Sequence, residues 1–298
     1  MTTINGFLRR RIGTNGLTLS VQEAGTGPAL ILLHGYPQNG MCWAKVAPTL
    51  AEHFHVLIPD LRGYGQSDAP CDDEWHGIYS KRAMAADITG MMDALGIDRA
   101  HILGHDRGAR VAYRLALDAP DRVRNLGIIE ILPTADYWAH WDAGLGMAAY
   151  HWTFLAQPAP LPEKMIGADP VFYIDWTLRS WTRAKSLHAF PPDSLATYHA
   201  QARDPARIAA MCADYRAGAS YDRALDEADR AAGRKIAAPL HFLWATTGFP
   251  SRLGQPAALW RAWADHVTDA SCDSGHFAME EAPEAVLAAY LPFFTGSA

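Results

Sequence analysis

The sequence predicts an α/β protein in which a mostly parallel, doubly wound sheet carries a helical insertion, and three observations support this. Through the first 130 residues, short apolar runs are followed by turn residues and then by helical patterns, the signature of repeated βαβ units. From about Asp136 five tryptophans crowd together, and strand-like runs disappear until Pro239. The strand pattern then returns. We therefore expect a core formed by residues 1–135 and 216–298 and a helical cap at 136–215.

Short apolar segments define the expected strands. Residues 17–23 alternate between apolar and polar side chains, which is typical of a half-buried strand. The later strands are short, mainly apolar runs, as expected where helices cover both faces of a parallel sheet. These runs lie at residues 29–33, 55–58, 100–104, 123–132 and 240–244. A polar loop is expected before Gly275.

Helical periodicity defines the segments between the strands. Residues 81–95 place Met84, Ile88 and Met92 on one face, and Gly96 follows as a candidate C-cap. Further core helices are expected at residues 43–51, 107–119, 257–266 and 283–294. Their alternation with the apolar runs completes the doubly wound pattern.

The composition excludes several classes of protein and partner. The 298 residues are 49% hydrophobic and 19% charged, which excludes disordered, collagen-like and disulfide-scaffold chains. A net charge of −6 argues against binding to nucleic acid or to an anionic membrane surface. The longest apolar runs have about five residues, far short of the roughly 20 that a membrane span needs. We expect a soluble protein.

The four cysteines are widely separated, at Cys42, Cys71, Cys212 and Cys272. Without a C-x-x-C spacing they indicate neither a zinc site nor a disulfide framework, and they fit a reducing cytosol. No export signal is expected at the arginine-rich residues 9–11, because 12–16 contain no apolar stretch. We expect a cytoplasmic protein without metal or organic cofactor, and leave homodimer formation open.

The candidate chemistry starts at residues 104–108, where Gly104, Asp106 and Gly108 have the G-x-D-x-G spacing of a nucleophile elbow. Small residues at both flanks allow the sharp strand-to-helix turn that exposes the central side chain. A carboxylate at that position can displace a leaving group from an sp³ carbon and form an ester, whereas attack on an amide or ester would give a high-energy anhydride. The alternative is that Asp106 only caps the following helix.

Two further features favour a catalytic role for Asp106. His276 lies 22 residues from the C-terminus, where the chain order nucleophile, acid, histidine places a general base. The turn at Gly35 follows a buried strand, so the backbone N–H of Tyr36 can supply half of an oxyanion hole and that of Arg107 the other half.

Over essentially its whole length the chain resembles the α/β-hydrolases, and within that fold it is similar to the haloacetate (fluoroacetate) dehalogenases. The closer resemblance rests on residues 104–110, the pair His151 and Trp152, Tyr215 and His276.

This resemblance implies roles for five further side chains. Arg107 and Arg110 are expected to bind the substrate carboxylate; Arg110 lies one helical turn beyond the nucleophile, so both can face one cavity. His151, Trp152 and Tyr215 are expected to bind the leaving halide. The expected partner is therefore a small-molecule haloacid.

One position departs from the family pattern. The family usually has an aspartate at the end of the strand that follows the nucleophile helix, and Glu130 stands there in this chain. Its carboxylate has the same charge and one more methylene, and residues 245–249 offer no acid in its place. We expect Glu130 to orient His276, with Asp136 as the second candidate.

The expected reaction is hydrolysis of a fluoroacetate or chloroacetate to glycolate and halide. Asp106 attacks the α-carbon and expels the halide, and His276 then activates the water that hydrolyses the aspartyl ester. An epoxide hydrolase is the alternative, since it uses the same two residues together with two cap tyrosines, for which Tyr150 and Tyr215 are the candidates. A non-catalytic scaffold is disfavoured because nucleophile and base are both present.

Overall fold

Eight strands form the central sheet in the computed structural model, which describes residues 2–296. They are β1 (Leu8–Thr14), β2 (Leu17–Ala24), β3 (Ala29–Leu33), β4 (His55–Pro59), β5 (Ala100–His105), β6 (Val123–Ile129), β7 (Leu240–Ala245) and β8 (Val267–Cys272). Their order is β1-β2-β4-β3-β5-β6-β7-β8. The pairs β1/β2 and β2/β4 are antiparallel and the others are parallel. The expected mostly parallel sheet is confirmed.

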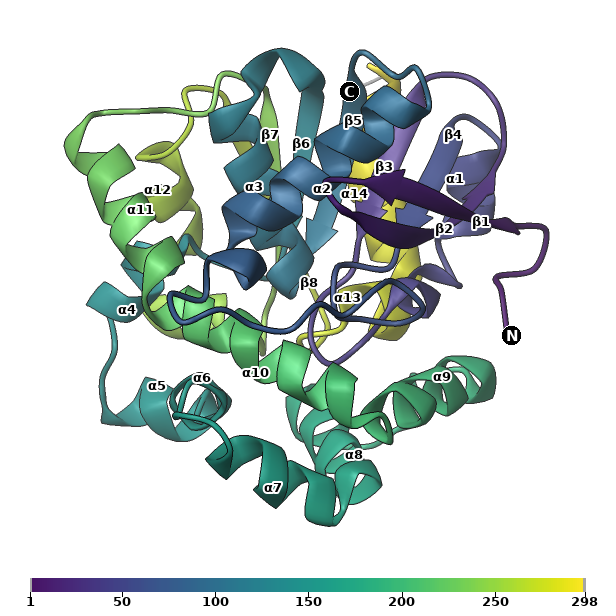
Figure 1. Cartoon of the computed structure of the whole chain (residues 1–298). Coiled ribbons are helices and arrows are strands. Elements are labelled where there is room, and N and C mark those ends of the chain that lie inside the picture. The colour runs from purple at the N-terminus through teal and green to yellow at the C-terminus, as the bar shows by residue number, and fades with distance from the viewer. Residues whose placement is uncertain (1, 297–298) are drawn as a thin grey trace.

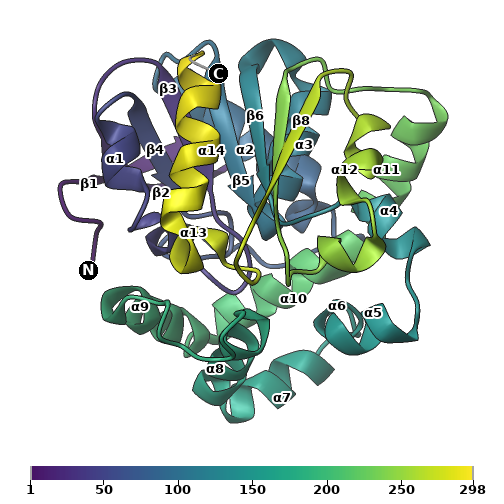
Figure 2. The same ribbon diagram turned by 180° about the vertical axis from the view of Figure 1, so that it is seen from behind.

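Helices cover both faces of the sheet, which buries most residues of its central strands. Figure 1 shows α2 (Lys81–Ala94) and α3 (Asp106–Asp118) in front of the sheet. The reverse view in Figure 2 shows α1 (Ala47–Ala51) and α14 (Pro283–Thr295) on the other face. Every residue of β5 is buried, as expected for a strand between two helical layers.

The remaining helices lie at one edge of the core and beyond one end of the sheet. They are α4 (Thr134–Ala139), α5 (Ala143–Ala148), α6 (His151–Leu155), α7 (Leu161–Ala168), α8 (Pro170–Trp181), α9 (Pro192–Ala202), α10 (Pro205–Ala219), α11 (Tyr221–Ala231), α12 (Pro256–Arg261) and α13 (Ala278–Glu281). Helices α5 to α10 gather beneath the sheet in both views (Figures 1 and 2). Residues 136 and 215, where we expected the cap to begin and end, fall inside α4 and α10.

Several expected elements differ from the structure at the sheet edges and in length. Strand β1 was not expected, and β8 lies where we expected a polar loop; both are edge strands with largely exposed residues, so neither forms an apolar run. The helix expected at 43–51 is a 3-10 turn, η1 (Gly40–Trp43), followed by the short α1. Strand β6 ends at Ile129 rather than at 132, and Glu130 follows it directly, with its backbone N–H still bonded to the Leu243 carbonyl of β7. No helix within residues 2–296 is long and apolar enough to cross a membrane.

Candidate active site

Asp106 stands between the end of β5 and the first turn of α3, with 6% of its surface exposed. Its φ of +47° lies in the left-handed region that residues other than glycine rarely adopt. The flanking glycines permit this turn, because a Cβ on Gly104 would overlap Ala109 and a Cβ on Gly108 would overlap the carbonyl oxygen of His34. The strained backbone of this strand-to-helix turn therefore presents the Asp106 carboxylate at the carboxyl end of the sheet.

The Asp106 carboxylate is held from two sides. The Tyr36 N–H donates to Oδ1 at 2.8 Å, and His276 Nε2 lies 3.6 Å from Oδ2. Burial by itself would raise the pKa of Asp106, but the adjacent His276 imidazole holds that pKa well below its ordinary value. The carboxylate is therefore ionised at neutral pH, as a nucleophile must be.

His276 lies between two carboxylates. Its Nδ1 is 3.9 Å from Glu130 Oε1, while its Nε2 faces Asp106. Both distances exceed a hydrogen bond, a loose geometry that substrate binding can tighten. Burial opposes protonation of the ring, but the two carboxylates outweigh it and raise the pKa of His276 to about 9.

Glu130 is the acid that faces this histidine. It follows β6 directly with φ of +61°, and its Oε2 accepts a 2.6 Å hydrogen bond from the Ala245 N–H. A Cβ at Gly248 would overlap the Glu130 carboxylate, so the loop after β7 approaches it as closely as a backbone can. Burial raises the pKa of Glu130, whereas His276 and the backbone N–H groups favour its ionised form.

Asp136, the second candidate for this role, is engaged elsewhere. Its Oδ1 pairs with Arg230, and its Oδ2 accepts a 2.6 Å hydrogen bond from Trp263 Nε1. Of the two acids, only Glu130 lies against His276.

The two arginines of α3 have different partners, although one helical turn separates them. Arg107 is completely buried and its Nη2 donates to Asp214 Oδ1 at 2.5 Å. Arg110 is 2% exposed and its Nη1 donates only to neutral acceptors, Leu132 O at 3.0 Å and Thr134 Oγ1 at 2.8 Å. Within residues 2–296 no carboxylate lies within salt-bridge distance of Arg110.

The three residues expected to bind halide belong to cap helices, His151 and Trp152 to α6 and Tyr215 to α10. His151 Nδ1 and Tyr215 Oη are buried without a hydrogen-bond partner among residues 2–296. Burial lowers the pKa of His151 well below its ordinary value, so this imidazole is neutral. The guanidinium carbon of Arg110 lies 4.6 Å from the centre of the Trp152 ring. These cap side chains thus combine apolar surface with unused polar atoms.

A small cavity of about 10 Å³ lies between the expected catalytic side chains of the core and the side chains of the cap. Its volume is close to that needed to hold one water molecule. Its lining includes six of the expected site residues, Asp106, Arg110, Glu130, His151, Trp152 and His276. Arg107, Tyr215 and Tyr36 are not among the lining residues. Tyr36 nevertheless contacts the nucleophile through its amide, and the Arg107 guanidinium lies 4.3 Å from the Tyr215 ring centre.

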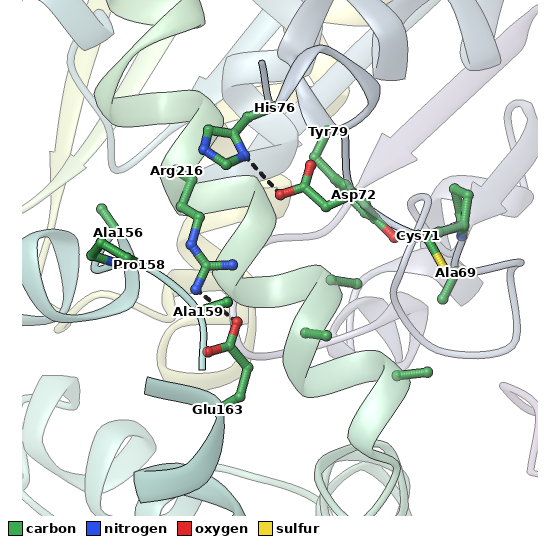
Figure 3. A pocket seen from close by; sticks show the side chains of 14 residues that line it. Ala69, Cys71, Asp72, His76, Tyr79, Ala156, Pro158, Ala159, Glu163 and Arg216 are labelled. Atoms are coloured by element: carbon green, nitrogen blue, oxygen red, sulfur yellow. Dashed lines mark hydrogen bonds and ion pairs between the residues drawn. The ribbon is translucent and has the colours of Figure 1, made fainter. Parts of the chain in front are cut away.

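A larger cavity of about 450 Å³ lies elsewhere, between the loop that follows Ala69 and the cap (Figure 3). Its charged side chains form pairs, His76 with Asp72 at 2.7 Å and Arg216 with Glu163 at 2.6 Å. None of the expected catalytic residues lines it. The expected catalytic residues line the small cavity and not this larger one, so size alone does not identify the candidate site.

Comparison with known proteins gives the family. A family described as "alpha/beta hydrolase fold" matches residues 28–283. The chain belongs to the α/β hydrolases. This confirms the fold that the elbow and the βαβ pattern predicted, and it places the chain in the hydrolase class of enzymes.

Two characterised relatives and one solved structure resemble this α/β hydrolase over nearly its whole length. A fluoroacetate dehalogenase from Burkholderia sp. is 42% identical over 279 residues, 94% of this chain and 91% of the relative. A soluble epoxide hydrolase from Corynebacterium sp. (strain C12) is 30% identical over 282 residues, 94% of each chain. The crystal structure of an α/β hydrolase from Nostoc sp. PCC 7120 superimposes with a TM-score of 0.95 at 42% identity, covering 98% of this chain and 99% of that one. The resemblance to the haloacetate dehalogenase family is confirmed.

Asp214 is a residue of this hydrolase that the sequence analysis did not single out. Its carboxylate accepts hydrogen bonds from Arg107 and from Tyr64 Oη at 2.8 Å, and it pairs with the buried Lys81. These contacts tie α10 of the cap to α2, α3 and the turn after β4. The only signal in the sequence was its place directly before Tyr215, because the partners are more than 100 residues away along the chain.

Proposed function

We propose that this α/β hydrolase removes halide from a haloacetate and releases glycolate. The observation that carries the proposal is the buried Arg110 guanidinium, which lines the small cavity without a carboxylate partner within residues 2–296. A buried charge is costly unless it is paired. Arg107 has its counterion in Asp214, so the cation that awaits an anion is Arg110, one turn from the nucleophile. A substrate carboxylate supplies that anion and brings the α-carbon to Asp106.

In the first step Asp106 attacks the α-carbon. Because Oδ1 is held by the Tyr36 N–H, the attacking atom is Oδ2. A C–O bond forms as the carbon–halogen bond breaks, and the electron pair of that bond leaves with the halide. The product of this step is an ester between Asp106 and the glycolyl carbon.

The halide leaves toward the cap side chains His151, Trp152 and Tyr215. His151 Nδ1 and Tyr215 Oη are donors without a competing partner among residues 2–296, and Trp152 contributes its indole N–H. Such fixed donors replace the hydration that a small anion loses in a closed site. Fluoride benefits most, since it is the most strongly hydrated of the halides.

In the second step His276 takes a proton from water, and the resulting hydroxide attacks the Asp106 carboxyl carbon. The negative charge then develops on Oδ1, the atom that the Tyr36 N–H already holds, with the Arg107 N–H as the second proposed donor. Collapse of this intermediate breaks the bond between the Asp106 carboxyl carbon and Oδ2, while the His276 imidazolium returns its proton to Oδ2, so glycolate leaves with its hydroxyl group. The regenerated Asp106 carboxyl group then gives up its proton and is ready for the next turnover.

Esterification also prepares the base. The pKa of His276 is about 9 while Asp106 and Glu130 both carry their charge. The ester has no charge, so it removes one of the two interactions that favour the imidazolium, and the pKa falls toward neutrality. The imidazole therefore becomes an effective base only after the first step has occurred.

Epoxide hydrolysis is the competing function, given the epoxide hydrolase relative and the shared nucleophile and base. It would need two tyrosines that donate to the epoxide oxygen. Tyr215 is buried near the site, but Tyr150 is 37% exposed and does not line the small cavity.

The deciding experiment measures halide release from fluoroacetate, chloroacetate and chloroacetamide, and diol formation from an aryl epoxide. We expect halide from the two acids and little from the amide. Arg110→Gln should raise KM for chloroacetate about 10- to 100-fold, the value of a charged hydrogen bond, and leave chloroacetamide turnover nearly unchanged. Diol without halide would establish the epoxide hydrolase instead, and equal kcat/KM for acid and amide would remove the role of Arg110.

A further inference from the structure

We call the small cavity at Asp106 the active cavity. A second cavity, of about 330 Å³, adjoins it on the cap side. Its lining includes Trp176, Trp181, Lys185, Phe249, Arg252 and His276. Two of these residues, Phe249 and His276, also line the active cavity. We call this larger space the outer cavity.

Phe249 forms the partition between the two spaces. Its ring centre lies 5.2 Å from that of His276, 5.5 Å from that of Trp181 and 6.1 Å from that of His151. The residue belongs to the loop after β7, where it directly follows Gly248, the glycine packed on Glu130. Phe249 and His276 therefore border both the outer cavity and the cavity at Asp106.

The charges of the outer cavity are all of one sign. Lys185 and Arg252 line it, and no acidic side chain does. Lys185 Nζ donates to the neutral carbonyl of Ser180 at 2.6 Å. The exposed Arg252 guanidinium has no hydrogen bond or salt bridge within residues 2–296. Asp273, an acid of the loop before His276, is paired with Arg183 and does not line the cavity.

This cationic lining stands out against the whole molecule, whose net charge is −6. An acidic protein repels a small anion in solution, and an unpaired cation at one opening reverses that effect locally. A lining of one sign with apolar walls, here tryptophan, tyrosine and phenylalanine side chains, focuses the field into the opening.

We propose that the outer cavity is the substrate entrance and that Arg252 and Lys185 select small monoanions by attracting them to it. The inference rests on the proposed function, because it assigns the route by which a haloacetate reaches Arg110 and Asp106. The two cations do not contact the reacting atoms. They raise the local concentration of anions at the partition formed by Phe249, and so act on kcat/KM rather than on the chemical steps.

The test compares Arg252→Gln, Arg252→Glu and Lys185→Gln with the control Arg124→Gln. Arg124 is an exposed cation near the start of β6, at the end of the strand opposite to Glu130. At low ionic strength we expect kcat/KM for chloroacetate to fall about 2- to 5-fold in the neutral variants and about 10-fold in Arg252→Glu, with kcat unchanged. The losses should disappear toward about 1 M salt, where charges are screened within a few ångströms. Chloroacetamide turnover and the control variant should not change.

A loss that is independent of salt, or one that affects chloroacetamide equally, would mean that Arg252 only shapes the opening and would overturn the proposal. So would the absence of any loss in Arg252→Glu.

A second readout does not depend on turnover, so it separates this inference from the proposed function. Trp176 and Trp181 line the outer cavity, and iodide quenches tryptophan fluorescence as an anion whereas acrylamide quenches it as a neutral molecule. Arg252→Glu should reduce quenching by iodide and leave quenching by acrylamide unchanged. If the wild-type protein released no halide from any haloacetate, the proposed function would fail, while this measurement would still decide whether the cavity attracts anions. Unchanged iodide quenching would reject the entrance.

Discussion

Asp106, Glu130 and His276 reach the active cavity from the carboxyl ends of the sheet strands, whereas His151 and Trp152 reach it from helix α6 of the cap. Tyr215, from α10 of the cap, does not line the cavity, but its ring centre lies 5.4 Å from that of His151. We call Asp106, Glu130 and His276 the core wall. Their charges shift one another's pKa values, and the two carboxylates raise the pKa of His276 to about 9. We call His151, Trp152 and Tyr215 the cap wall. These side chains are neutral, and His151 Nδ1 and Tyr215 Oη have no hydrogen-bond partner among residues 2–296.

The difference between the walls indicates a division of labour. Charged groups held at strand ends can form and break covalent bonds, since their protonation states are fixed by neighbours a few ångströms away. Neutral, desolvated donors can only stabilise charge that arrives from elsewhere. Variants of the core wall should therefore abolish turnover, and variants of the cap wall should change the preference among leaving groups.

The largest effect is expected at the nucleophile. Asp106→Asn keeps the shape of the side chain but removes the charge that attacks carbon, so turnover should fall by a factor on the order of 10⁴ or more. Halide release over many turnovers checks this, and circular dichroism and the melting temperature verify that the fold is intact. Multiple turnover at a rate near that of the wild type would contradict the ester mechanism.

The next effect separates the two chemical steps. His276→Asn lacks the base of the second step only, so it should release one halide per active site and then stop. Intact-protein mass spectrometry should show a stable added mass that maps to the peptide containing Asp106. With Asp106→Asn as the control, no mass should be added. Absence of an adduct in His276→Asn after substrate exposure would falsify the assignment of His276 to hydrolysis of the ester.

The third prediction concerns the acid behind the histidine. Glu130→Gln removes a negative charge 3.9 Å from Nδ1, so the pKa of His276 should fall below about 9. Because the neutral imidazole is the active base, the rising limb of kcat against pH should move to lower pH, while the maximal kcat falls by about 10²- to 10⁴-fold as the ring loses its orienting partner. Glu130→Asp keeps the charge and is the matched control, expected to retain the position of this limb. An unchanged limb in Glu130→Gln would show that Glu130 is structural.

The smallest effect is expected at the cap wall, and it is one of selectivity. Tyr215→Phe and Trp152→Phe each remove one donor, worth about 1–3 kcal/mol for a charge that is otherwise unsolvated. Fluoroacetate turnover should therefore fall about 5- to 150-fold, and chloroacetate turnover much less, because chloride leaves with less assistance. Tyr150→Phe is the control, since this tyrosine is partly exposed and lines only the outer cavity. Equal losses on both substrates would show that the residues only shape the pocket.

The sequence was informative where function depends on local geometry. The elbow at Asp106 needs one glycine two residues before it and another two residues after it, and this pattern is visible in five consecutive residues. Glu130 was found by counting one strand onward, although the strand ends three residues earlier than expected. The edge strands β1 and β8 were missed, because an exposed strand need not form an apolar run.

Contacts between distant segments were not predictable in this way. Nothing near Arg107 or Arg110 in the sequence shows that the first is paired with Asp214 and the second is not. Phe249 and Arg252 lie in a loop with no recognisable motif, and only the folded chain shows that they border a cavity shared with His276.

By itself the sequence determined most of the alternation of strands and helices and the glycine-flanked turn at Asp106, because each depends on steric rules that act over a few residues. The tertiary structure decided which charges are compensated, which donors remain unused and where the cavity opens. Those properties depend on burial and on distances between side chains that lie more than 100 residues apart, and an electrostatic interaction takes its strength from both.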